Sequence, residues 1–304
     1  MAVLRMGYVH VRVTDLAKAK DHYANTLGLY PTREETGRLF FKGWDEWDHH
    51  SVVLEEGGVG ASKFGFKVWD PAELDVYEKR AQQFGVTVER MSAGENPEVS
   101  DGLRFHLPIE HTVELYHAMT PVGLEVGTHN PDAFPRHLIG VGAPILDHAL
   151  LIGDDIDTTA RFFMEVLDMY APEKLQTDLS DDAESLAYWL SAGQKAHDVA
   201  LLKGPNGKLH HFAFQMRGWG DILHAADILA MDGVPIDVGP TRHGITRGET
   251  IYFWDPSGNR NETFSGGYTA FRDRPQIIWT GDEIAKGIFY HARELKDTFM
   301  NVHT

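Results

Sequence analysis

Three residues of metal-binding types stand far apart in the second half of the chain: His148, His211 and Glu262. His148 lies in an alternating segment typical of a β-strand, and His211 lies in a second such segment, KLHHFAFQM. Glu262 follows the turn sequence DPSG and begins or continues a third strand, NETF. Two imidazoles and one carboxylate on one face of a metal ion leave the opposite face open. Non-haem Fe(II) oxygenases use this arrangement to bind substrate and dioxygen together, so the sequence predicts one iron site here.

Three further side chains near this predicted site could move or hold protons. His197 lies in the segment KAHD at the entry to a strand, His243 lies in the loop PTRHG, and Tyr252 lies on the strand TIYF. An imidazole with a pKa near neutrality can accept and return protons, and a tyrosine hydroxyl can hold a phenolate oxygen. By contrast, we expect His210 to be structural, because its neighbour His211 should face the opposite side of the pleat.

The elements that position these residues occur twice along the chain. Residues 7–30 begin with alternating valines and continue through Asp15, a typical helix N-cap, into apolar residues at helical spacing that end at Gly28. The same succession of strand, acidic turn and helix recurs over residues 145–170, and later segments also match in pairs. The chain is therefore a tandem duplication.

The first copy carries a different set of residues at the matched positions. We match His10 with His148 and Glu114 with Glu262, while Lys63 takes the place of His211. A lysine ammonium group cannot ligate a metal and repels a divalent ion. We therefore expect a vestigial site in which Lys63 pairs with Glu114, and one metal ion per chain. His50 matches His197 and would be a relic.

We predict an α+β fold built from tandem βαβββ repeats, with two domains that each close a curved mixed sheet. The N-terminal repeat domain would span residues 1–130 and the C-terminal catalytic repeat domain residues 131–275. Two prolines and polar residues near positions 130–135 indicate the linker. Residues 276–304 lie outside the repeat, and their apolar spacing over 282–300 predicts a tail helix that covers the active site.

Composition excludes several classes of function. Hydrophobic residues make up 42% of the 304 residues, which is enough for one or two cores. The net charge of −17 disfavours binding to nucleic acid or to anionic lipid. The absence of cysteine excludes disulfides, thiolate metal sites and cysteine nucleophiles. The N-terminus does not have the pattern of a signal peptide, and no apolar run approaches the roughly 18 residues of a membrane span. We expect a cytoplasmic protein.

These motifs resemble those of the type I extradiol dioxygenases of the vicinal-oxygen-chelate superfamily. The signature is Thr241-x-His243, seven residues, Ile251-Tyr252, two residues, Asp255-Pro256-x-Gly258, three residues and Glu262. The likeness extends over essentially the whole chain. It is most specific for the catechol 2,3-dioxygenases in the segments LDHALL, KAHDVALL, KLHHFAF, GPTRHG, IYFWDPSGNRNE and KGIFYHARELKDTFMNV.

The resemblance implies a function and a role for each site residue. His148, His211 and Glu262 would bind Fe(II), with Mn(II) as the less favoured metal. His197 would act as acid–base catalyst, and His243 and Tyr252 would hydrogen-bond oxygens of the substrate. The substrate ring would be lined by Trp189, Ile245, Thr246, Ile288 and Phe299. A homotetramer would cleave catechol and small alkylcatechols with O2 to 2-hydroxymuconate semialdehyde, in the degradation of aromatic compounds.

Three alternatives remain open at this stage. The enzyme could act on a larger or carboxylated catechol, for which Arg242 and Arg247 are the nearest basic candidates in the sequence. The chain could instead be a non-catalytic protein that binds an aromatic ligand on the same fold. A glyoxalase-type isomerase would need ligands from both repeats, and Lys63 argues against this possibility.

Overall fold

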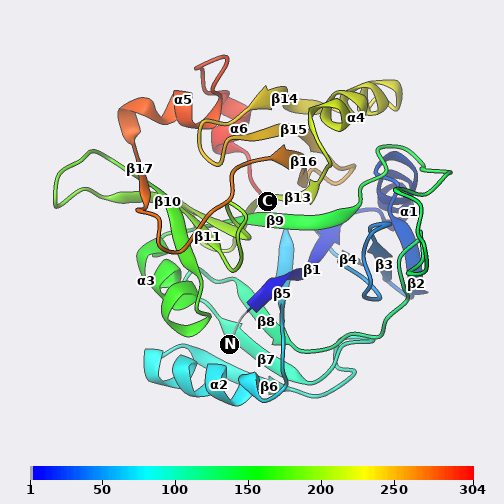
Figure 1. Cartoon of the computed structure of the whole chain (residues 1–304), viewed down its shortest axis with the longest axis horizontal. Coiled ribbons are helices and arrows are strands. Elements are labelled where there is room, and N and C mark those ends of the chain that lie inside the picture. Colours follow the sequence, from blue (N-terminus) through cyan, green and yellow to red (C-terminus); the bar gives the residue numbers. More distant parts are fainter. Residues whose placement is uncertain (1–2) are drawn as a thin grey trace.

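The computed structural model describes residues 3–304, which form two large mixed β-sheets, one from each half of the chain (Figure 1). The predicted α+β fold with two sheet domains is confirmed. The first half contains the helices α1 (Leu16–Asp21), η1 (His22–Thr26) and α2 (Glu73–Phe84). Its strands are β1 (Val3–Val13), β2 (Tyr30–Glu35), β3 (Arg38–Lys42), β4 (Val52–Glu56), β5 (Ala61–Val68), β6 (Thr87–Met91), β7 (Gly102–His106) and β8 (Thr112–Tyr116).

The second half repeats this plan and adds a tail. Its helices are α3 (Ile156–Arg161), η2 (Phe162–Val166) and α4 (Trp219–Met231), and the tail holds η3 (Gly281–Glu283), α5 (Ile284–Ile288) and α6 (Asp297–Asn301). Its strands are β9 (Ile145–Gly153), β10 (Tyr170–Gln176), β11 (Ser185–Ser191), β12 (Val199–Lys203), β13 (Lys208–Gln215), β14 (Ile236–Arg242), β15 (Gly248–Trp254), β16 (Arg260–Gly266) and β17 (Ile277–Thr280).

Each sheet contains the βαβββ unit twice. The order of the first sheet is β2-β3-β4-β1-β5-β8-β7-β6, and that of the second is β14-β15-β16-β13-β9-β12-β11-β10-β17. In the first, β1 pairs antiparallel with β5 and parallel with β4, and β5 pairs parallel with β8. The predicted unit is therefore correct, but each half of the chain holds two copies of it side by side.

The start of the first helix in each half agrees with the sequence pattern. Asp15 accepts hydrogen bonds from the backbone N–H groups of Ala17 and Lys18, and Asp155 accepts one from Thr158. These caps satisfy N–H groups that have no partner inside the helix. Both helices then widen into a π-helical turn, and Gly28 follows with a positive φ of 74°.

Strand register corrects one of the predicted matches between the halves. Tyr8 lies opposite Gly65 on β5, and His148 lies opposite Ala213 on β13. Tyr8, and not His10, is thus the counterpart of His148. Tyr8 precedes the N-cap Asp15 by the same number of residues as His148 precedes the N-cap Asp155. The match with His10 was wrong by two residues because strand alternation has a period of two, so a shift of two preserves the apolar pattern.

The tail differs from the single helix that the sequence predicted. Residues 277–280 add the edge strand β17 to the second sheet beside β10, and the three short helical segments η3, α5 and α6 follow instead of one helix. The rings of Phe289 and Phe299 lie 4.9 Å apart. In one continuous helix, ten residues would separate them by about 15 Å. The chain must therefore break between α5 and α6 to bring both rings together.

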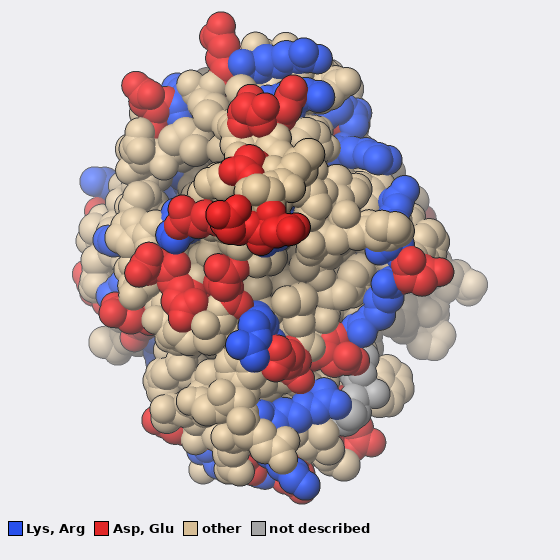
Figure 2. All heavy atoms as spheres, turned by 90° about the vertical axis from the view of Figure 1, so that its left-hand side faces the viewer, with Lys and Arg blue, Asp and Glu red and all other residues tan. Residues whose placement is uncertain are grey.

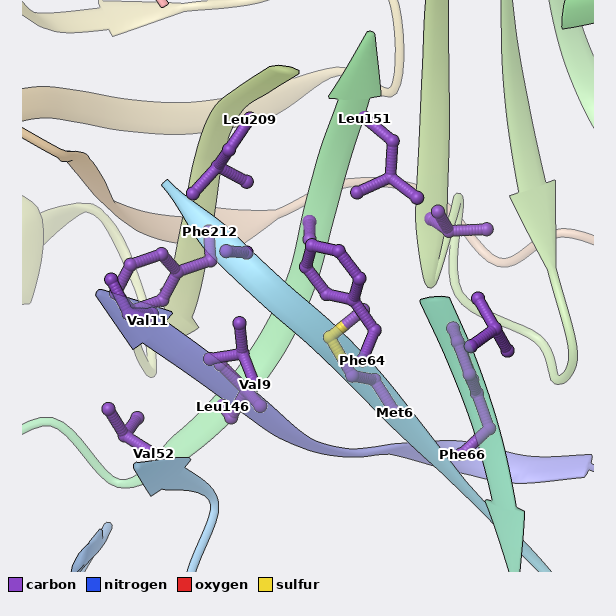
Figure 3. Close-up of a cluster of buried hydrophobic side chains, with 14 of the residues drawn as sticks. Met6, Val9, Val11, Val52, Phe64, Phe66, Leu146, Leu151, Leu209 and Phe212 are labelled. Carbon is purple, nitrogen blue, oxygen red and sulfur yellow. The ribbon is translucent and has the colours of Figure 1, made fainter. Parts of the chain in front are cut away.

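One buried core connects the two halves (Figure 3). Val9, Val11 and Phe64 from the first sheet pack in the same cluster as Leu151 and Phe212 from the second. Both sheets therefore share an apolar interior, which fixes the two halves against each other and holds the strands that carry the predicted site.

The surface carries the acidic excess that the composition indicates. On the face shown in Figure 2, acidic side chains gather near the middle, with basic side chains scattered between them and towards the edges. Together with the net charge of −17, this distribution disfavours long-range attraction of polyanions. Among residues 3–304, no helix combines the length and the apolar character that crossing a membrane requires.

We predict that removing one ring from the shared core destabilises the whole molecule. Phe66 is 1% exposed and its ring lies 6.0 Å from that of Phe163 in the other half. Phe66→Ala should lower the free energy of unfolding by about 3–5 kcal/mol, measured by urea denaturation followed by circular dichroism. The matched control is Trp69→Ala, which removes an exposed ring and should change stability by no more than about 0.5 kcal/mol. Two separate transitions, only one of them shifted by Phe66→Ala, would contradict a single continuous core.

Candidate metal centre and active-site cavity

The three predicted ligands meet at the centre of the second sheet. His148 on β9, His211 on β13 and Glu262 on β16 come from three adjacent strands, and all three are buried. Glu262 Oε2 lies 3.0 Å from the Nε2 atoms of both histidines, and those two nitrogen atoms are 3.4 Å apart. Three potential ligand atoms therefore converge on one point.

The spacing of these atoms fits a metal ion. Two ligand atoms that each lie about 2.1 Å from one ion are about 3.0 Å apart at an octahedral angle and about 3.4 Å apart at a tetrahedral angle. The three observed separations fall in this range. Burial opposes ionisation of Glu262, but His211 and His148 hold the pKa of its carboxyl group well below its usual range. A buried carboxylate beside two imidazoles is a donor set suited to a divalent cation.

A buried carboxylate orients the first histidine ligand. Asp147 Oδ2 lies 2.6 Å from His148 Nδ1, and Lys195 Nζ lies 3.0 Å from Asp147 Oδ1. Burial raises the pKa of Asp147, but Lys195 and His148 reverse this effect and keep the group ionised. Because a carboxylate can only accept, His148 Nδ1 carries the hydrogen and Nε2 is free to bind metal.

The second histidine ligand contacts His210, which corrects another expectation. β13 has a bulge between Leu209 and His211, since these residues pair with consecutive residues of β9. The bulge brings His210 to the same side as His211, and their Nδ1 atoms lie 2.7 Å apart. The prediction that His210 faces away was wrong, because a bulge interrupts the alternation on which it depended. Burial, together with His211 and Arg260, lowers the pKa of His210 well below its ordinary value.

Tyr252 and His243 form a hydrogen-bonded pair on one side of the ligand triad. The Tyr252 hydroxyl lies 2.9 Å from His243 Nε2, and His243 Nδ1 lies 2.5 Å from the carbonyl oxygen of Ile288 in the tail. A carbonyl only accepts, so His243 Nδ1 donates and its Nε2 accepts from Tyr252. Burial and the charge of Glu262 raise the pKa of Tyr252 well above its ordinary value. The hydroxyl therefore stays protonated and can act as a donor.

His197 lies on another side of the triad, just before β12. Its ring centroid lies 4.0 Å from that of His148, and the side chain is buried. Burial and the neighbouring charge of His148 lower the pKa of His197 well below its ordinary value. A neutral imidazole at this position can accept a proton from a molecule bound at the triad.

Beyond these polar groups, the cavity wall is apolar. Trp189, Ile245 and Ile288 line it together with Phe299 from α6. The tail thus closes the cavity from outside the repeat. All eleven residues that the sequence predicted for ligation, catalysis or substrate contact line this one cavity.

A buried glutamate, which the sequence did not indicate, holds part of this wall. Glu173 accepts hydrogen bonds from the backbone N–H of Thr246 (2.6 Å) and from Trp279 Nε1 (2.6 Å) on β17. Thr246 and Arg247 have positive φ values of 61° and 60°, which are costly for residues other than glycine. The carboxylate of Glu173 therefore stabilises a strained loop that carries two cavity residues, Ile245 and Thr246.

The first half of the chain has an ion-pair network at the equivalent place. Glu114, the counterpart of Glu262, accepts from the Tyr8 hydroxyl at 2.6 Å and from Arg104 Nε at 2.7 Å. Lys63 Nζ lies 3.4 Å from the same carboxylate, which confirms the predicted pair. Arg104 is the register counterpart of Tyr252, because each lies opposite the corresponding glutamate. Two cationic side chains thus occupy the space that a metal ion would need.

Models of known protein families match both halves of the chain. A family model described as "Glyoxalase/Bleomycin resistance protein/Dioxygenase superfamily" matches residues 145–263. A second model, described as "Catechol 2,3-dioxygenase-like N-terminal domain", matches residues 63–120.

Similar full-length proteins are also known. The chain is 42% identical to metapyrocatechase from Pseudomonas sp. (strain CF600), with 99% of each chain covered. It is 26% identical to a manganese-dependent 2,3-dihydroxybiphenyl 1,2-dioxygenase from Geobacillus genomosp. 3, over 97% of this chain and 95% of that one. The crystal structure of the 2,3-dioxygenase LapB from Pseudomonas sp. KL28 superposes with a TM-score of 0.88 at 42% identity, covering 93% of this chain and 99% of that one.

We predict that each chain binds one divalent metal ion, at His148, His211 and Glu262. Titration of the metal-free protein with Fe(II) under anaerobic conditions should saturate at one equivalent, because Lys63 and Arg104 occupy the other site. His211→Ala should abolish metal retention in metal analysis after desalting. As a matched control, Lys63→Ala changes the corresponding residue of the first half and should leave one equivalent bound. Two tight sites in the unmodified protein would contradict the assignment.

Proposed function

The chain belongs to the catechol 2,3-dioxygenase (metapyrocatechase) family of extradiol ring-cleaving dioxygenases, and we propose that His148, His211 and Glu262 hold its catalytic Fe(II). The enzyme uses O2 to cleave the bond between one hydroxylated carbon of catechol and the adjacent carbon that carries no hydroxyl group. The product is 2-hydroxymuconate semialdehyde. Both atoms of dioxygen enter the product, so the reaction consumes no net proton.

The observation that carries this proposal is the convergence of three ligand atoms with three proton-handling groups in one apolar cavity. His197, His243 and Tyr252 all line the cavity into which His148, His211 and Glu262 project. A protein that only sequesters an aromatic ligand needs the apolar wall but has no use for this set of polar groups. Enzymatic ring cleavage accounts for both.

The protein groups would divide the proton transfers between them. When bound, the metal supplies open positions at which the catechol oxygens and dioxygen meet and exchange electrons. His197, neutral because it is buried, accepts a proton from the bound catechol and returns one later in the cycle. The Tyr252 hydroxyl donates to His243 Nε2 in this structure, and on substrate binding it would donate instead to an ionised catechol oxygen. The apolar wall excludes bulk water and aligns the ring.

The cavity favours an uncharged catechol over a carboxylated one. Among residues 3–304, no lysine or arginine side chain lines this cavity. Arg242 pairs with Glu249, and the guanidinium group of Arg247 lies over the ring of Tyr268, 5.0 Å from its centroid. Neither basic candidate is available to a substrate carboxylate. We propose catechol and small alkylcatechols as substrates, since an alkyl group would contact aliphatic side chains.

We also propose that the metal ion at this site is Fe(II) rather than Mn(II). Imidazole and carboxylate ligands suit both ions, and one relative is named as manganese-dependent. The choice of iron rests on the ligand set of two imidazoles and one carboxylate, which non-haem Fe(II) oxygenases use, and another relative is named as iron-dependent. We also propose a homotetramer in the cytoplasm; exposed apolar side chains such as Leu179 and Met231 are suitable for subunit contacts.

Turnover of catechol tests the proposed function. Protein loaded anaerobically with Fe(II) should, on addition of catechol and air, consume one O2 per catechol and form a yellow product. Parallel loading with Mn(II) distinguishes the metals, and 3-methylcatechol, 4-methylcatechol, 2,3-dihydroxybiphenyl and 3,4-dihydroxyphenylacetate define the substrate range. We expect the carboxylated substrate to be the poorest. Catechol binding without oxygen uptake or colour, in protein that contains one Fe(II), would favour the ligand-binding alternative.

Substitution of the proposed acid–base catalyst should separate binding from turnover. His197→Phe keeps the aromatic volume beside His148 but cannot accept a proton. It should retain one metal ion and bind catechol, while kcat falls about 10²–10⁴-fold. Metal analysis, anaerobic catechol titration and oxygen-uptake kinetics together measure this. Full activity in the variant would show that another group performs the proton transfer.

A further inference from the structure

We propose that His210 is a positioning residue that fixes the metal-binding form of His211 and connects this ligand to the C-terminal tail. The inference rests on the proposed role of His211 as a ligand. It concerns a residue that lines the same cavity but is not one of the three ligand residues.

The chain of hydrogen bonds begins at the ligand and ends on a backbone carbonyl. His211 Nδ1 lies 2.7 Å from His210 Nδ1, and His210 Nε2 lies 2.8 Å from the carbonyl oxygen of Phe299 in α6. All of these groups are buried, with the His210 side chain 2% exposed. The bulge in β13 makes the contact possible, because it places two consecutive histidines on one side of the sheet.

The carbonyl group determines where each hydrogen lies. Since the Phe299 oxygen can only accept, His210 Nε2 must donate, and in a neutral imidazole Nδ1 is then the acceptor. His211 Nδ1 must therefore carry its hydrogen, which leaves His211 Nε2 with a free lone pair. That atom is the one that lies 3.0 Å from Glu262 Oε2. The carbonyl group of Phe299 thus selects the tautomer of His211 through the hydrogen bonds of His210, which lies between them.

The two histidine ligands are oriented in different ways. His148 Nδ1 contacts the carboxylate of Asp147, which is held by Lys195 and not by a residue of the tail. His211 depends instead on a neutral side chain whose own partner belongs to the tail. Only the orientation of His211 can therefore respond to how α6 is docked.

Several interactions hold this part of the tail against β13. Arg260, 1% exposed, donates to the carbonyl oxygens of His210 (3.1 Å), Thr298 (2.8 Å) and Val302 (2.9 Å). The backbone groups of Leu209 and Thr304 exchange two hydrogen bonds. The ring of Phe299 also stacks edge-on against His210, with centroids 4.6 Å apart. Phe299 therefore contributes its ring to the cavity wall, and its carbonyl oxygen accepts from His210, which contacts His211. Docking of α6 thus both closes the cavity and sets the hydrogen bond to His211.

The first half of the chain contains a natural control for this arrangement. His49 and His50 are also consecutive and buried, and their Nδ1 atoms lie 3.0 Å apart. His50 Nε2 has no hydrogen-bond partner within residues 3–304, and the pair lies in the half without the ligand triad. A substitution of His49 removes a similar histidine pair without touching the metal site.

Three substitutions of His210 test the proposal. Asn places an acceptor near the position of Nδ1 but cannot reach Phe299, whereas Gln reaches towards Phe299 but has no acceptor at the Nδ1 position; Ala does neither. The rate of metal transfer to an excess of chelator should rise about 10–100-fold for H210A and H210Q. H210N should stay close to the unmodified protein. H49Q should release metal at the unmodified rate.

Spectroscopy of the Co(II)-loaded protein gives a second readout that does not depend on activity. The Nδ1 hydrogen of each histidine ligand should give an exchangeable, paramagnetically shifted proton resonance. We expect one resonance to be lost or to exchange faster in H210A and H210Q and to persist in H210N, while the His148 resonance is unchanged in all three.

Two results would overturn the inference. One is metal release at the unmodified rate in all His210 variants, with both resonances intact. The other is rescue by Gln but not by Asn, since His210 would then support only the tail. Unfolding midpoints measured in parallel separate either result from general destabilisation. Failure of the unmodified protein to bind Co(II) or Fe(II) would instead reject the ligand assignment itself.

Discussion

A buried carboxylate at the same place in each half is the constraint on which the rest of the structure depends. Glu114 and Glu262 are both fully buried, and both lie on strands that pair in parallel with a central strand of their sheet. An ionised carboxylate cannot remain in an apolar interior without compensation by positive charge and hydrogen bonds. Each half therefore needs positive charge and hydrogen-bond donors beside its glutamate, and the source of that charge decides what the half can do.

The two halves meet this requirement differently. Around Glu114, the chain provides its own cations, Lys63 and Arg104, and a tyrosine hydroxyl completes the network. Around Glu262, the corresponding residues are His211, Tyr252 and His148, which carry no fixed charge. This half therefore presents coordinating atoms, to which a divalent ion would add positive charge. The same duplicated fold thus yields a structural ion-pair cluster in one copy and the proposed catalytic centre in the other.

The sequence predicted the repeat, the fold class and the convergence of the eleven site residues, because all of these follow from residue type and periodicity. It missed features that depend on register or on long-range contacts. The match between His10 and His148 failed because alternation does not fix register, and the interpretation of His210 failed because a bulge has no clear signal in the sequence. The break in the tail and the contact of Glu173 with Thr246 depend on the packing of segments that are distant in the chain. Lys63, which stands where the second half has His211, could be read directly from the sequence. This one difference distinguished the half with the metal-ligand set from the half without it.

The self-contained cluster around Glu114 has a consequence for how the protein withstands a shortage of metal. Its partners Tyr8, Lys63, Asn96 and Arg104 are part of the chain, so the first half keeps its charges balanced whether or not metal is present. In the second half, Glu262 has its two histidines as partners without metal, and the binding energy of a metal ion would then add to the folding energy. Because the two halves share one core, loss of metal from the second half should lower the stability of the whole molecule. The ion-pair cluster of the first half does not depend on metal, so metal supply would affect the stability of the protein through the second half as well as its activity.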